Sequence, residues 1–110
     1  MTDLIQKKCI PCEVGGSALT LDQAQTLMAQ IPEWTLTADG KQITRSFTFK
    51  DFAEALNFTN EIGAIAEEEG HHPDLTVAWG KVGVTLWTHA VGGLSENDFI
   101  LAAKIDQIKV

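Results

Sequence analysis

The sequence has few basic residues and no long apolar run. Lys and Arg number 8 against 15 Asp and Glu, which gives a formal net charge of −7 at pH 7. Nucleic acids and anionic lipids attract Lys and Arg, so this excess of acidic residues argues against non-specific binding to either. A membrane span needs roughly 20 apolar residues in a row, and the longest apolar runs here are only a few residues. Residues 1–14 do not resemble a signal peptide, because they contain no long apolar stretch. We therefore expect a cytoplasmic protein with no nucleic-acid or membrane partner.

Cysteine is scarce as well, with only Cys9 and Cys12, in the order Cys-Ile-Pro-Cys. A thioredoxin-like redox pair needs a strand before it and a helix after it, and neither is evident around this segment. A zinc site needs two further ligands, for which histidines are the candidates. The interpretation that we favour is a reduced pair in an N-terminal arm, with no metal bound.

The length of 110 residues and the hydrophobic content of 45% fit one globular domain. Gly15-Gly16-Ser17 marks the joint between an N-terminal arm and the folded part of the chain. We expect a loose N-terminal arm over residues 1–18 and a folded domain over residues 19–110.

Three helix starts carry a cap residue followed three positions later by an acidic or amide side chain, the spacing of a capping box. The pairs are Thr20 with Gln23, Asp51 with Glu54, and Ser95 with Asp98. The first helix should stop before Pro32 and the second at Gly70. The last helix is apolar, which suggests a subunit contact.

Four strands are expected between these helices, over residues 34–37, 41–49, 75–79 and 82–89. Asp39-Gly40 and Gly80-Lys81 are the predicted turns of two hairpins. The order α-β-β-α-β-β-α predicts an α+β domain, in which helices pack on one face of a four-stranded antiparallel sheet.

The sequence contains three histidines, His71, His72 and His89. A two-residue turn at Gly80-Lys81 would place Trp79 opposite Val82 and, in the same register, His72 opposite His89. The three imidazoles would then meet at one end of the hairpin. Such a cluster fits acid–base catalysis, a metal site, or simple packing around a turn. Adjacent residues of an extended chain point to opposite faces, so His71 and His72 favour acid–base chemistry over one shared metal.

Three glutamates precede this cluster at the end of the second helix, where acidic side chains oppose the helix dipole. We interpret Glu68 and Glu69 as solvated, and the unfavourable position of three acids suggests a role for at least one of them.

The pattern around these residues resembles the signature of the pterin-4a-carbinolamine dehydratase family. Glu67 precedes His71-His72-Pro73 by four residues, an aromatic follows the Pro by six, His89 comes ten residues later, and an Asp follows soon after. Pro32-Glu-Trp34, the strand around Arg45 and the closing segment 101–106 also look like the family. The resemblance covers roughly residues 19–108. Trp79 stands where Tyr is frequent in the family, and Ser95 where Thr is common.

The resemblance implies removal of water from a 4a-hydroxytetrahydropterin to give the quinonoid dihydropterin, in support of aromatic amino acid hydroxylation. It implies no cofactor, a pterin as the small-molecule partner, and a homodimer or homotetramer. His71 and His89 would exchange protons near C4a and N5 of the pterin, and His72 would hold the ring. The supporting roles implied are Glu67 orienting His71, Asp98 supporting the cluster, and Trp34 and Trp79 lining the pocket unless they pack in the core.

Three alternatives stay open from the sequence. Mammalian members of the family also act as a dimerisation cofactor of a homeodomain transcription factor, so the chain could be an interaction module without turnover. It could instead bind a metal through Cys9, Cys12 and histidine. The third alternative is a family member that acts on another pterin or on molybdopterin.

Overall fold

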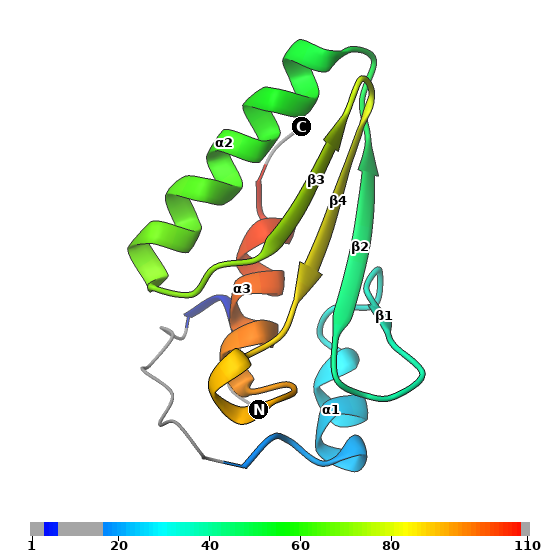
Figure 1. The fold of residues 1–110 in the computed structure, drawn as a ribbon, viewed down its shortest axis with the longest axis vertical. Helices are drawn as coiled ribbons and strands as arrows, with labels where there is room; N and C mark the ends of the chain where they lie inside the picture. The colour runs from blue at the N-terminus through cyan, green and yellow to red at the C-terminus, as the bar shows by residue number, and fades with distance from the viewer. Residues whose placement is uncertain (1–3, 7–16, 109–110) are drawn as a thin grey trace.

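The computed structural model describes residues 4–6 and 17–108 of the chain. A four-stranded antiparallel sheet forms one layer, in the strand order β1-β2-β4-β3, and the helices pack on one face of it (Figure 1). The elements are η1 (Leu4–Gln6), α1 (Leu21–Met28), β1 (Thr35–Leu36), β2 (Ile43–Thr48), α2 (Phe52–Glu69), β3 (Asp74–Ala78), β4 (Lys81–Leu86), η2 (His89–Val91) and α3 (Glu96–Asp106). The predicted fold class and element order are confirmed.

The caps predicted for the first two helices are present. The Thr20 hydroxyl accepts a hydrogen bond from the Gln23 N–H at 3.2 Å, and the Gln23 side chain accepts from the Thr20 N–H at 2.8 Å. Asp51 likewise accepts from the Glu54 N–H at 2.9 Å. Gly70 ends α2 with φ 66°, a left-handed conformation that favours glycine. These local signals therefore fix where α2 ends and where the segment that carries His71 begins.

The turn of the β3–β4 hairpin lies one residue earlier than predicted, which changes the partner of every residue across the hairpin by two positions. Ala78 pairs with Lys81 and Val77 with Val82, so the turn is Trp79-Gly80. A side chain at Gly80 would bring its Cβ to 2.8 Å from the carbonyl oxygen of Phe49, which leaves room only for glycine. The register predicted from a Gly80-Lys81 turn is therefore wrong, although a shift of two keeps every side chain on its expected face.

Helix α3 lies inside the core of the single chain. Phe99, Leu101 and Ile105 are fully buried, and so is Leu86 of β4. The prediction that this helix is apolar because it forms a subunit contact is wrong, because its apolar side chains are already covered by the chain's own elements. The first turn of α3, which carries Asp98, is therefore fixed in place by the packing of the helix in the core.

Part of the N-terminal arm packs on this core. Element η1 lies against α3, and the Leu4 side chain is 2% exposed. The Leu4 N–H donates to the Gln30 side chain at 3.2 Å. The expectation of a loose arm over residues 1–18 therefore fails for Leu4–Gln6, while Cys9 and Cys12 lie outside the described residues.

Within residues 4–6 and 17–108, no helix combines the length and the apolar character that crossing a membrane requires.

Candidate functional site

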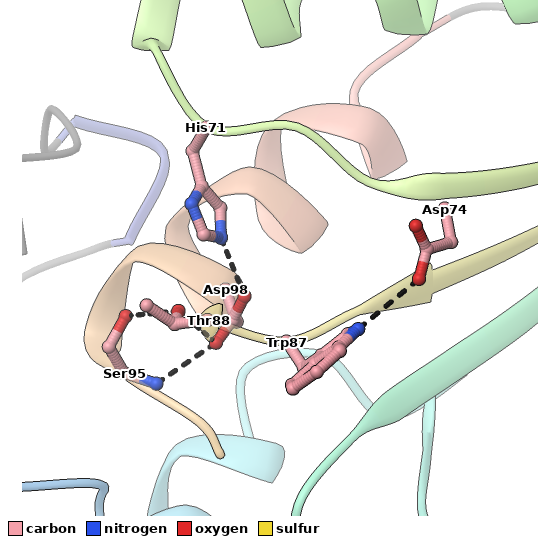
Figure 2. A network of polar contacts seen from close by, with 6 residues as sticks. All are labelled: His71, Asp74, Trp87, Thr88, Ser95 and Asp98. Carbon is pink, nitrogen blue, oxygen red and sulfur yellow. Dashed lines mark hydrogen bonds and ion pairs between the residues drawn. The ribbon is translucent and has the colours of Figure 1, made fainter. Parts of the chain in front are cut away.

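A buried carboxylate lies at the centre of the candidate site. Asp98, in the first turn of α3, has no exposed side-chain surface. One oxygen, Oδ2, accepts from the Ser95 N–H at 2.9 Å and from the Thr88 hydroxyl at 2.8 Å. The other oxygen, Oδ1, lies 2.6 Å from Nε2 of His71 (Figure 2). The Thr88 proton is directed at Asp98, so the Ser95 hydroxyl donates to Thr88 across their 2.8 Å contact.

His71 reaches this carboxylate from the segment that follows α2. Gly70 turns the chain out of the helix, and the His71 N–H donates to the carbonyl of Ala66 at 3.2 Å. The imidazole is 12% exposed. An ionised carboxylate only accepts hydrogen bonds, so Nε2 is the nitrogen that carries the proton. The other nitrogen, Nδ1, is then left with its lone pair, and the ring can accept a proton there.

His72 has a different partner from His71. Its Nε2 is hydrogen-bonded to the Glu67 carboxylate, and both side chains are largely exposed. The prediction that Glu67 orients His71 is therefore wrong. Asp98 makes the contact with His71 instead, and its support of the whole cluster stays a prediction. Neighbouring histidines thus have separate carboxylates, one buried and one exposed.

His89 begins η2, directly after Thr88 of the Asp98 network. Its ring packs on the indole of Trp87, with ring centroids 3.7 Å apart and an angle of 40° between the planes. The Trp87 Nε1–H donates in turn to Asp74 at 3.2 Å (Figure 2). These contacts attach the His89 segment to the segment that carries His71 and His72.

The two tryptophans predicted to line the pocket lie elsewhere. Trp34 is buried, and its Nε1–H donates at 2.9 Å to Asp106 in the last turn of α3, at the far end of that helix from Asp98. Trp79 is 69% exposed in the β3–β4 turn, at the end of the hairpin away from Asp74. Neither ring is brought to the histidines in the single chain.

Two residues of this arrangement were missed at the level of sequence. Trp87 precedes His89 by two positions, so strand alternation could have placed both on one face. Thr88 lies between them and is only 4% exposed. A hydroxyl that alternation places toward the core at the end of a strand needs a buried hydrogen-bond partner. The structure shows that this partner is Asp98.

The described residues offer no cluster of three or more His, Cys, Asp or Glu arranged to hold a metal ion. The two cysteines are outside that set, so the alternative that uses them is not tested by it.

The sequence profile of the family described as pterin 4 alpha carbinolamine dehydratase matches residues 17–108. The chain belongs to this family. Among its relatives, proteins named as candidate pterin-4-alpha-carbinolamine dehydratases are 48% identical in Alkaliphilus metalliredigens, over 97% of this chain and 96% of theirs, and 47% identical in Chlorobaculum tepidum, over 98% and 99%. The family resemblance read from the histidine signature is confirmed over nearly the whole chain.

Two solved structures share the fold of this family member. A Brucella melitensis protein described as a transcriptional coactivator/pterin dehydratase has a TM-score of 0.76 and 34% identity, covering 82% of this chain and 96% of that one. A pterin dehydratase-like protein described as a RuBisCO assembly factor in the alpha-carboxysome has a TM-score of 0.58 and 24% identity, covering 67% and 86%. At that identity the second likeness shows the fold alone.

Proposed function

We propose that this chain dehydrates 4a-hydroxytetrahydropterin to the quinonoid dihydropterin by histidine acid–base catalysis. The observation that carries the proposal is the 2.6 Å contact between His71 Nε2 and the fully buried Asp98 carboxylate. This contact fixes the ring and leaves Nδ1 as a proton acceptor. Membership of the pterin 4 alpha carbinolamine dehydratase family supports the choice of substrate.

The reaction needs two proton transfers and no change of redox state. The proton on N5 of the pterin leaves, and the electron pair of the N5–H bond forms the N5=C4a double bond. The C4a–O bond breaks as the hydroxyl oxygen receives a proton, and water departs. A positioned acid and a positioned base supply both transfers, and such help typically accelerates a reaction by about 10²–10⁴-fold.

The contacts favour His71 as the base. Asp98 accepts from Nε2 and would stabilise the imidazolium that forms when Nδ1 takes the proton from N5. His89 would then give the proton to the departing hydroxyl. His72, which is exposed and paired with Glu67, would hold the pterin. Turnover would thus convert His71 from a neutral imidazole to an imidazolium and His89 from an imidazolium to a neutral imidazole, and proton exchange with water would reset both rings.

The test is the dehydration rate of 4a-hydroxytetrahydropterin that a hydroxylase generates in place. We expect wild type to accelerate the reaction and His71→Ala to lose about 10²-fold or more of kcat. His72→Ala should mainly raise KM, because it removes binding rather than proton transfer. Full kcat in both His71→Ala and His89→Ala would refute the assignment of these roles.

The proposal extends to a homo-oligomer, dimer or tetramer. Phe52 and Leu56 of α2 are 45% and 42% exposed, and Val77 and Trp79 near the β3–β4 turn are 37% and 69% exposed. The start of α2 and that turn lie at the same end of the molecule, joined by the 2.8 Å bond from the Phe49 N–H to the Gly80 carbonyl (Figure 1). Large apolar side chains gathered at one end favour a protein contact. The same surface also fits the alternative, an interaction module without turnover. Folded wild type that does not accelerate the dehydration would support this alternative.

A further inference from the structure

The side chain of Trp87 touches both chain segments that carry the histidines. On one side its indole packs on the His89 ring, with centroids 3.7 Å apart. On the other side its Nε1–H donates at 3.2 Å to the Asp74 carboxylate, at the start of β3 and two residues beyond His72 (Figure 2). One aromatic ring therefore connects the start of β3 to the start of η2.

His89 is an exposed residue in a three-residue 3-10 helix. An exposed imidazole ordinarily samples several rotamers, and a reaction with two proton transfers needs both rings in fixed places. A flat partner against one face of the ring removes most of that freedom. The partner is itself fixed by its hydrogen bond to Asp74, so the position of His89 is tied to the segment of His71 and His72.

We propose that Trp87 is a positioning residue that sets the His89 imidazole relative to His71 and His72. The proposal rests on the proposed function, because it assigns His89 one of the two proton transfers. Trp87 acts through two separable contacts, the ring packing on His89 and the N–H bond to Asp74. The first places the imidazole, and the second places the indole.

Three variants separate these contacts. Trp87→Leu removes both, Trp87→Phe keeps an aromatic face without the N–H, and Asp74→Ala removes only the acceptor. We expect Trp87→Leu to lower kcat about tenfold with little change in KM, since misplacement of a proton-transfer group slows the chemical step. Trp87→Phe should restore part of this loss. Asp74→Ala should add little to Trp87→Phe, because both variants lack the same bond.

An NMR spectrum of the His89 ring gives a readout that does not depend on turnover. An indole face against the imidazole shifts the ring-proton resonances of His89 upfield, and Trp87→Leu should abolish this shift. Trp79→Leu makes the same change in the turn of the same hairpin and should leave the His89 resonances in place.

Each outcome decides the proposal. Loss of the upfield shift together with the tenfold loss of kcat supports it. Loss of the shift with kcat unchanged would overturn the positioning role and leave the dehydratase function standing. Absence of the upfield shift in wild type would overturn the packing itself. Absence of turnover by folded wild type would refute the dehydratase function, and the role of Trp87 with it.

Discussion

Asp98 accepts hydrogen bonds from three donors, the His71 ring, the Thr88 hydroxyl and the Ser95 N–H. With two donors directed at Oδ2, the carboxylate has one orientation, and Oδ1 is presented to His71. The acid–base role that we propose for the site thus depends on which nitrogen of the His71 imidazole carries the proton. That choice is made by a side chain that the substrate does not need to touch.

Asp98→Asn tests this choice directly. The Thr88 and Ser95 donors should retain the amide oxygen, so the amide NH₂ would face Nε2 and force it to become an acceptor. The proton would move to Nδ1, and kcat should fall about 10²-fold or more. Long-range ¹H–¹⁵N spectra of His71 would identify the protonated nitrogen. Asp106→Asn, the same change at the other end of α3, should leave it unchanged. Protonation of Nε2 in Asp98→Asn would contradict the role of Asp98.

At the scale of the elements, an ion pair holds the end of α2 against α3. Lys104 Nζ lies 2.6 Å from Glu69 Oε2, and the two side chains are 18% and 3% exposed. The interpretation of Glu69 as a solvated residue is therefore wrong, although Glu68 beside it is exposed. The ion pair fixes the C-terminus of the helix two residues before His71.

Removal of Lys104 should destabilise the fold, because the buried Glu69 carboxylate would lose its cationic partner. We expect Lys104→Met to lower the free energy of unfolding in urea by about 3 kcal/mol, and the double variant with Glu69→Leu to recover most of it. Lys50→Met is the matched control. Lys50 and Glu54 are 75% and 45% exposed and lie 3.5 Å apart, so the loss there should stay below about 1 kcal/mol. Equal losses in the two single variants would show that the Glu69 pair adds no stability of its own.

At the scale of the whole molecule, the apolar surface at the start of α2 and the β3–β4 turn predicts self-association. Phe52→Asp should reduce the assembly state measured by sedimentation, because it introduces a charge where a contact would bury the ring. Leu21→Ser, at an exposed leucine of α1, is the control and should leave the assembly state unchanged. A wild-type chain that sediments as a monomer would contradict the prediction.

The sequence by itself determined the helices and strands, the family, and the residues on which the proposed site is built. Cap residues such as Thr20 and Asp51 act through bonds to backbone three positions away, and Gly70 acts through its own φ angle, so local sequence was sufficient. The alternation of apolar and polar residues in the strands and the spacing of the histidines are likewise properties of the local sequence, so they could be recognised without the structure.

Tertiary structure decided which carboxylate meets which histidine. Glu67 is one helical turn from His71 and yet pairs with His72, because Gly70 redirects the chain, while Asp98 arrives 27 residues later on a helix packed from elsewhere. It also decided that Trp87, and neither Trp34 nor Trp79, lies against an imidazole. Contacts between distant segments depend on a register and a packing that local spacing does not encode, and a turn displaced by a single residue was enough to change the partners across the β3–β4 hairpin.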